Sequence, residues 1–454
     1  MSHGKVIAQL THLWRMRMTS GFDRYTLDIV YSQKLVGKLH LSRESDNLSL
    51  SYQQEWVNEG FPISPHLPFG HDIPSVNIRR FLQNLLPENK GLDYLIDYLG
   101  VSRTNVFAQI GGIGKDTSGA MMFLPEGALN DKIKSNFIAI SDAELIKRLS
   151  DPQLWHLEVW DGKPRLSVAG VQSKLNVLAV DGKLGFGEGD LCSTHIIKFE
   201  KNNQQHLVMN EFVTMKLAKL AGLSVAQVEL KYFDHHPALL VERFDRKLFS
   251  PESVKRRHMI DACQACNLGV DKKYERNLGK QRDVCHIRDG ASFEKLFVLA
   301  ELCENPIAAK IEILKWALFN LCIYNSDAHG KNFSFFVQKS GLIPAPFYDL
   351  VNVKMYPEFE QDLAMSIGDE FDPDAINAYQ LVDFADENGI SKKLLQSHLT
   401  KIATNIKNNL QQAISLVDSP SESQVSYLKH YFDIVNARCD HFLEQANVIP
   451  DIEL

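Results

Sequence analysis

The chain has 454 residues, of which 44% are hydrophobic and 23% are charged. This length exceeds what one compact core usually holds, so we expect two or three domains. The 49 Lys and Arg residues against 56 Asp and Glu give a net charge of −7, which argues against broad, non-specific binding to nucleic acid. Polar residues interrupt the N-terminal segment too early for a signal peptide, and no run reaches the roughly 18 apolar residues that span a bilayer. We therefore expect a soluble, cytoplasmic protein that does not enter a membrane.

The seven cysteines are scattered and odd in number, which suits a reducing compartment better than a disulfide framework. Cys263 and Cys266 form a single C-x-x-C pair. No second pair with zinc-ligand spacing follows, and apolar residues at helical spacing surround the first. We interpret both cysteines as packing residues on a helix.

The N-terminal third begins with strands and continues with helices. Alternating apolar and polar positions predict three strands at 25–31, 34–41 and 47–52. Residues 76–100 have helical spacing with a break at Pro87.

The glycine-rich stretch at 107–127 superficially resembles a phosphate-binding P-loop but does not match its motif. Asp116 follows Gly114-Lys115 where a P-loop needs Ser or Thr, and Gln109 stands where its first glycine belongs. We interpret the stretch as a structural loop that leads into a strand.

Residues 165–246 predict a β-rich lobe with a single helix. Asp181-Gly182 is a favoured two-residue hairpin turn between two apolar runs. The helix covers 206–223 and ends near Gly222, and further strands are expected at 194–201, 226–233 and 237–246.

After residue 257 the chain becomes mainly helical. The helical period of 3.6 residues runs through 256–269, 292–305, 306–324 and much of 374–445. The segment 333–350 interrupts these helices and has the pattern of a β-hairpin.

Polar residues with catalytic spacing lie between the helix at 306–324 and this hairpin. Asp327 precedes Asn332 by five positions, the interval between the catalytic aspartate and the metal-binding asparagine of protein kinases. Asp349 follows the hairpin, where kinases keep a second metal-binding aspartate. A carboxylate, an amide and phosphate oxygens together suit Mg²⁺. We interpret His329, between the first two, as structural and assign it no proton transfer.

Two upstream residues complete a kinase constellation. Lys198 on a strand and Glu211 on the next helix have the order of the lysine–glutamate ion pair in a kinase small lobe. Lys198 or Glu211 alone is typical of a solvated surface charge. Together with Asp327, Asn332 and Asp349, however, they follow one another in the same order as the corresponding residues of protein kinases, and on the same kinds of element. The pattern also departs from ordinary protein kinases: Asn325 and Ser326 precede Asp327 in place of His-Arg.

These departures identify a family. The segments LSVAGVQSK, THIIKFE, LLVERFDR, NSDAHGKNFS and PFYDL together resemble the HipA-type serine/threonine kinases, the toxins of bacterial toxin–antitoxin pairs. The resemblance continues through FLQNLLPEN and SGAMMFLPEG and covers the chain from about residue 22. It implies an α+β, two-lobed protein-kinase-like fold with these parts: an extension at 1–21, a HipA-type N-terminal subdomain at 22–150, a small lobe with a phosphate loop at 151–246 and a helical large lobe with the catalytic loop at 247–454.

The resemblance also implies roles for individual residues. Asp327 is the expected catalytic aspartate, Asn332 and Asp349 are the expected Mg²⁺ ligands, and autophosphorylation of Ser167 silences the kinase. The residues expected to contact ATP are Val168, Ala169, Gly170, Lys174, Lys198, Glu242, Phe244, Gln264, His329 and Lys331.

The expected partners follow from the same resemblance. They are a dimeric helix-turn-helix antitoxin of the HipB type, operator DNA bound mainly through that antitoxin, and a protein substrate. In the best-known member the substrate is glutamyl-tRNA synthetase, whose phosphorylation arrests translation. Two alternatives stay open at this point: a catalytically idle, kinase-shaped repressor subunit, and a small-molecule phosphotransferase.

Overall fold

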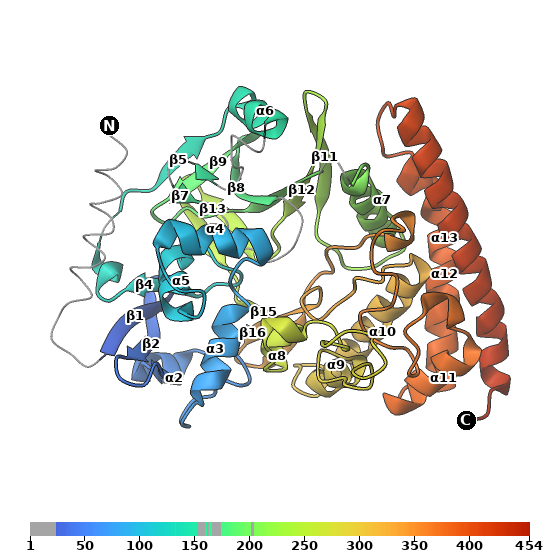
Figure 1. Ribbon diagram of the computed structural model, residues 1–454, viewed down its shortest axis with the longest axis horizontal. Helices are drawn as coiled ribbons and strands as arrows, with labels where there is room; N and C mark the ends of the chain where they lie inside the picture. Colours follow the sequence, from blue (N-terminus) through green and yellow to red (C-terminus); the bar gives the residue numbers. More distant parts are fainter. Residues whose placement is uncertain (1–23, 132, 152–158, 161–162, 166–173, 201–203) are drawn as a thin grey trace. The chain divides into compact units, whose positions relative to one another are not determined.

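The computed structural model describes residues 24–131, 133–151, 159–160, 163–165, 174–200 and 204–454 (Figure 1). The chain divides into two compact units. The first unit contains the chain up to Ile197 together with 243–260 and 337–339, and the second contains 198–242, 261–336 and 340–454. Ser167, Val168, Ala169 and Gly170, the expected autophosphorylation site and phosphate loop, lie outside the described residues.

The first unit begins with an antiparallel sheet in the order β3-β2-β1-β4. Its strands are β1 (Arg24–Tyr31), β2 (Lys34–Ser42), β3 (Leu48–Tyr52) and β4 (Met122–Pro125), so the three strands expected before residue 52 are confirmed. The helices between β3 and β4 are α2 (Gln54–Glu59), α3 (Ser75–Gln83), α4 (Asn89–Leu99) and α5 (Val106–Ile113).

Helix α5 corrects the first part of the loop predicted for the glycine-rich stretch, whereas residues 114–121 form a loop that leads into β4, as predicted. Asn105 begins this helix by accepting a hydrogen bond from the backbone N–H of Ala108. A Cβ at Gly112 would lie 2.5 Å from a methyl carbon of Leu99 on α4, and one at Gly114 would lie 2.2 Å from the carbonyl oxygen of Phe123. Gly112 and Gly114 therefore allow close packing of neighbouring segments. A glycine-rich sequence alone does not show whether its glycines serve such packing or form a loop.

The rest of the first unit is mainly β-structure. The predicted hairpin is formed by β8 (Lys174–Val180) and β9 (Lys183–Glu188), and Asp181 and Gly182 between them both have positive φ, as a type I′ turn requires. Strand β5 pairs with β9, and the division between the units falls inside β10, after Ile197. The remaining elements are β5 (Asn136–Ala139), α6 (Asp142–Ser150), β6 (Val159–Trp160), β7 (Lys163–Pro164), β10 (His195–Phe199), β13 (Arg246–Ser250) and β14 (Ser253–Arg256).

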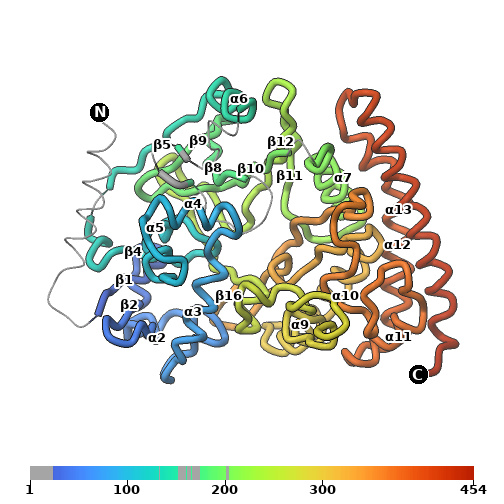
Figure 2. Tube along the Cα trace, viewed as in Figure 1, coloured from blue at the N-terminus to red at the C-terminus, as the bar shows by residue number. Residues whose placement is uncertain are grey.

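The second unit is built around buried helices. Helix α7 (Leu207–Leu220) is followed by the hairpin of β11 (Val228–Phe233) and β12 (His236–Glu242). Helices α12 (Lys392–Ile414) and α13 (Glu422–Val448) pack side by side, and α12 also packs on α7 and on α10 (Pro306–Cys322) (Figure 1). Strands β16 (Ser334–Gln338) and β17 (Gly341–Pro344) form the expected hairpin, after which the chain runs irregularly to α11 (Ala378–Glu387) (Figure 2).

The helix predicted for residues 256–269 is wrong over most of its length. Strand β15 (Met259–Asp261) occupies its middle, and the helix that follows, α8 (Ala262–Ala265), is a single turn. Asp261 fixes where α8 begins, because its carboxylate accepts from the N–H of Gln264 while the Gln264 side chain accepts from the N–H of Asp261. Asn267, with a positive φ, ends the turn. Helix α9 (Phe293–Ala300) then follows as predicted.

None of the helices in the described part of the chain is long and apolar enough to cross a membrane.

Candidate active site

The segment 323–333 between α10 and β16 carries the expected catalytic residues. Helix α10 begins at Asn305, whose side chain accepts from the N–H of Ala308, and Pro306 occupies its first turn. Tyr324, with φ of 55°, turns the chain away from the helix axis. The side chains of His329, Lys331 and Asn332 are buried, whereas that of Asp327 is exposed.

Hydrogen bonds inside this loop fix its shape. The backbone oxygen of Asp327 accepts from the N–H of His329 at 2.8 Å and from the side-chain amide of Asn332 at 2.9 Å. Because the Asn332 nitrogen is used in this way, its Oδ1 is the atom left to meet a cation. The loop thus presents one carboxylate and one amide oxygen at a fixed interval, and burial of its polar groups is offset by these bonds.

Lys331 ties the loop to α8. Its ammonium nitrogen lies 3.1 Å from Oδ2 of Asp261, the residue that also begins α8, and both side chains are nearly buried. The hydroxyl of Tyr348 donates to the backbone oxygen of Lys331 at 2.6 Å. The side chain of Gln264 belongs to the same cap. Asp261 was not expected from the sequence to take part in the site, and the contacts of Lys331 and Gln264 with the nucleotide stay predictions.

Lys198, Glu211 and Asp349 form a three-membered ionic cluster within the second unit. The Lys198 ammonium lies 2.7 Å from Oε1 of Glu211 and 2.5 Å from Oδ1 of Asp349. The side chains of Lys198 and Glu211 are 9% and 1% exposed, and that of Asp349 is 37% exposed. Burial alone lowers the pKa of Lys198, but the two carboxylates outweigh burial and raise it, so the amine stays charged.

The conformation of Asp349 is enforced by the chain that follows it. Asp349 has φ of 58°, in the left-handed region where a residue other than glycine is strained. Three residues later, Asn352 is locked to Asn210 on α7: the N–H of Asn352 donates to Oδ1 of Asn210 at 2.8 Å, and the Asn210 amide donates back to the Asn352 carbonyl at 2.9 Å. Both asparagines are fully buried. This clamp was not predicted, although Asn210 directly precedes Glu211 in the sequence.

The chemistry of these side chains fits a magnesium nucleotide. Asn332 and Asp349 supply the hard oxygen atoms that Mg²⁺ prefers, and Mg²⁺ in nucleotide sites commonly takes only one or two protein ligands. Within the described residues, no group of three or more His, Cys, Asp or Glu side chains forms a metal site.

The remaining predicted nucleotide residues are distributed over both units. Lys174, buried on β8, and Phe244, half-buried, belong to the first unit; Glu242 ends β12 in the second unit with an exposed side chain. Phe244 lies between Arg243 and Asp245, which form a buried ion pair at 2.9 Å. Arg246 also pairs with Asp245, at 2.7 Å, so these three charged residues have structural partners.

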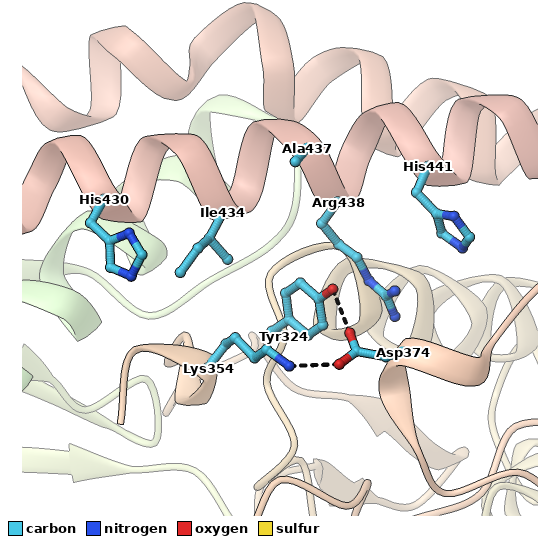
Figure 3. Close-up of a pocket in the computed structure, with 8 residues that line it drawn as sticks. All are labelled: Tyr324, Lys354, Asp374, His430, Ile434, Ala437, Arg438 and His441. Atoms are coloured by element: carbon cyan, nitrogen blue, oxygen red, sulfur yellow. Dashed lines mark hydrogen bonds and ion pairs between the residues drawn. The ribbon is translucent and has the colours of Figure 1, made fainter. Parts of the chain in front are cut away.

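A separate pocket of about 530 Å³ opens beside α13 in the second unit (Figure 3). In it the hydroxyl of Tyr324 donates to Oδ1 of Asp374 at 2.8 Å, and the ammonium of Lys354 lies 2.6 Å from Oδ2 (Figure 3). Of the residues expected to bind ATP or Mg²⁺, those that the structure describes do not line this pocket. The lining residues are Tyr324, Lys354, Asp374, His430, Ile434, Ala437, Arg438 and His441.

The two cysteines of the C-x-x-C pair differ in their surroundings. Cys263 is fully buried on α8, whereas Cys266 directly follows this helix and is partly exposed. Burial raises the pKa of the Cys263 thiol and raises that of Cys266 to about 12. Full burial of Cys263 agrees with the packing role predicted for it.

Comparison with known proteins identifies the family. The HipA N-terminal domain matches residues 27–124 and the HipA-like C-terminal domain matches residues 166–413. The serine/threonine-protein kinase toxin HipA of Shewanella oneidensis is 49% identical over 94% of this chain and 98% of its own length. The putative kinase Y4mE of Sinorhizobium fredii is 30% identical over 92% of this chain and 96% of its own.

The fold agrees with these matches. The structure of Shewanella oneidensis HipA in a complex with HipB and its operator DNA superimposes with a TM-score of 0.88, covering 94% of this chain and all of that one. The mixed fold predicted from the sequence, β-rich in its N-terminal part and helical in its C-terminal region, is confirmed. The chain therefore belongs to the HipA family and is a serine/threonine-protein kinase of that family.

Proposed function

We propose that this chain transfers the γ-phosphoryl group of ATP to a serine or threonine of a protein, as the toxin of a toxin–antitoxin pair. The observation that carries the proposal is the cluster of Lys198, Glu211 and Asp349. It combines a buried, charged lysine on a strand with a glutamate on the following helix and an aspartate after the catalytic loop, as phosphoryl transfer in kinases requires.

Each residue has one task in the reaction. Lys198 binds phosphate oxygens of ATP, and Glu211 keeps the ammonium in place. Asp327 orients the acceptor hydroxyl and takes its proton as the oxygen bonds to the γ-phosphorus and ADP leaves. Asn332 and Asp349 would hold Mg²⁺, which would supply offsetting charge to the phosphates.

The nucleotide site extends beyond these residues in the proposal. Glu242, at the end of the β11–β12 hairpin, and Phe244, shortly after it, hold the adenine. Lys174 and residues 168–170 contact the phosphates. Ser167 is the site whose autophosphorylation inhibits the kinase. Gln264, His329 and Lys331 lie in or next to the loop that carries Asp327, which supports a place beside the nucleotide.

The proposed partners are a dimeric helix-turn-helix antitoxin and, through it, operator DNA. The complex of the Shewanella relative with HipB and operator DNA supports this assignment, as does the acidic net charge of −7, which disfavours direct DNA binding by this chain. The proposed substrate is a component of translation in the cytoplasm, such as an aminoacyl-tRNA synthetase, with glutamyl-tRNA synthetase the first to test.

The direct test is intact-mass spectrometry with peptide mapping after incubation with MgATP. We expect one added phosphate on the wild-type chain, and none on Asp327→Asn or Asp349→Asn proteins that keep the wild-type melting temperature. Full phosphorylation of a folded Asp327→Asn protein would reject the catalytic assignment.

A second candidate, an idle kinase-shaped repressor subunit, is distinguished by ATP binding and turnover. The complete cluster around Lys198 disfavours it. If MgATP at concentrations that saturate kinases leaves the melting temperature unchanged, and no phosphate is transferred, the idle subunit is the correct interpretation.

A further inference from the structure

Tyr274 contacts the catalytic aspartate directly. It lies in the irregular segment between α8 and α9, to which the sequence assigned no role. Its hydroxyl donates a hydrogen bond to Oδ1 of Asp327 at 2.6 Å, across 53 positions of sequence. The tyrosine is itself 37% exposed and the Asp327 side chain is exposed, so the bond is formed at the surface.

The position of Tyr274 is fixed from two sides. Its ring meets the ring of His329 edge to face, with centroids 5.1 Å apart and planes at 89°. On the chain before it, the carbonyl of Lys273 accepts from the N–H of Gly330 at 2.9 Å. The segment is therefore joined directly to the catalytic loop.

The residue after Tyr274 is an anchor. Glu275 is buried, its N–H donates to the carbonyl of Ala364 at 2.9 Å, and its Oε2 accepts from the N–H of Ser366 at 2.8 Å. Arg288 adds an ion pair to the same carboxylate at 2.5 Å. Tyr274 is thus held at its ring and by both neighbouring residues of the chain, which is what a residue needs in order to hold another in place.

His329 acquires a role in this arrangement. Its backbone N–H is bonded to Asp327, and its ring nitrogen Nδ1 accepts from the N–H of Lys331 at 3.3 Å. The ring is thereby oriented to support Tyr274. His329, between Asp327 and Asn332, then acts through the tyrosine, without any proton transfer of its own.

Asp327 needs such support because its side chain is exposed. An exposed carboxylate samples several rotamers, and phosphoryl transfer requires one oxygen aimed at the acceptor hydroxyl. The bond from Tyr274 occupies Oδ1 and leaves Oδ2 as the oxygen that accepts from the substrate.

We propose that Tyr274 is a positioning residue of the kinase, which holds Asp327 in the rotamer that accepts the acceptor proton. The inference rests on the proposed function, since it assigns Asp327 the part of catalytic carboxylate. The competing alternative is that the phenol occupies the acceptor's place and blocks the site.

The test compares Tyr274→Phe with the wild-type chain. Starting from phosphatase-treated protein, the rate of ³²P incorporation into the chain is measured over a range of MgATP concentrations. We expect the maximal rate to fall 10- to 100-fold, with the half-saturating ATP concentration unchanged within twofold. The phenylalanine keeps the ring against His329, so the melting temperature should stay within 1–2 °C, roughly the shift of a neutral surface substitution.

Tyr232→Phe is the matched control. It removes a phenol hydroxyl that accepts a hydrogen bond from the side-chain amide of Gln424 at 3.2 Å, at a similarly exposed position (45%) in the same unit. We expect it to leave both kinetic parameters unchanged.

The outcomes separate the inference from the function on which it rests. An unchanged maximal rate in Tyr274→Phe, with Asp327→Asn inactive, rejects the positioning role and leaves the kinase assignment intact. A faster Tyr274→Phe protein also rejects it, in favour of a blocking phenol, and a change confined to the ATP requirement rejects it in favour of nucleotide binding. If a folded Asp327→Asn protein keeps full activity, the catalytic assignment fails and the inference fails with it.

Discussion

Replacing Glu211 by glutamine removes one of the two negative charges around Lys198 while keeping the side chain's volume. Glu211 is almost completely buried, and its Oε1 lies 2.7 Å from the Lys198 ammonium. After the substitution the buried lysine has one charged partner, Asp349, whose side chain is partly exposed. We expect the second unit to lose stability.

The magnitude follows from two opposing terms. At an effective dielectric constant of about 20, two unit charges 2.7 Å apart attract by about 6 kcal/mol. Removing the carboxylate also removes the cost of burying it, which is several kcal/mol, and the Lys198–Asp349 pair remains. The net loss should be about 2–3 kcal/mol, or roughly 4–12 °C in melting temperature for a unit of this size.

Differential scanning calorimetry measures the effect, with Glu229→Gln as the matched control. Glu229 and Lys231 form a pair at 2.8 Å in the same unit, but both side chains are far more exposed than those of the buried pair. Such a pair contributes about 0–1 kcal/mol, so the control should shift the melting temperature by no more than about 2 °C. Equal shifts in the two proteins would refute the reasoning, because burial would then make no difference.

Three further predictions concern stability. Burial lowers the pKa of His258 to about 4, so the stability that its neutral form provides should be complete above pH 6.5. It should be lost as the pH falls toward 4, by up to about 3 kcal/mol. In urea denaturation, the free energy of unfolding of His258→Gln should therefore fall less steeply with decreasing pH than that of the wild type. Burial raises the pKa of Glu200 to about 7, so the stability that its protonated form provides should be present below pH 4.5 and lost as the pH rises through 7. The free energy of unfolding of Glu200→Gln, relative to that of the wild type, should therefore be higher at pH 8 than at pH 5. Asn210→Ala should cost about 2–3 kcal/mol in urea denaturation, since it leaves buried groups of Asn352 unpaired, and a loss below about 0.5 kcal/mol would contradict the clamp.

The elements with strong local signals were predictable. The turn at Asp181-Gly182 requires positive φ at both positions, which few other residue pairs adopt easily, and Asn305-Pro306 marks the start of α10 by capping chemistry. The order of Lys198, Glu211, Asp327, Asn332 and Asp349 along the chain also indicated a kinase, because each residue type suits its step in phosphoryl transfer.

What the sequence did not indicate depends on contacts between distant residues. Tyr274 and Asp327 are 53 positions apart, and no local pattern marks a tyrosine in an irregular segment as a hydrogen-bond donor to a catalytic carboxylate. The clamp between Asn210 and Asn352 spans 142 positions. The helix expected at 256–269 failed because the pairing of β15 in a sheet overrode a helical apolar pattern.

Asp261 has a consequence for which substitutions the chain can tolerate. Its Oδ1 begins α8 and its Oδ2 neutralises Lys331 in the catalytic loop. Asparagine keeps the cap but places an uncharged amide against a buried ammonium, and glutamate keeps the charge but is a poor first residue for a helix. No single replacement satisfies both, so sequence variation should be restricted at position 261 as tightly as at the catalytic positions, although the reaction itself assigns this carboxylate no step.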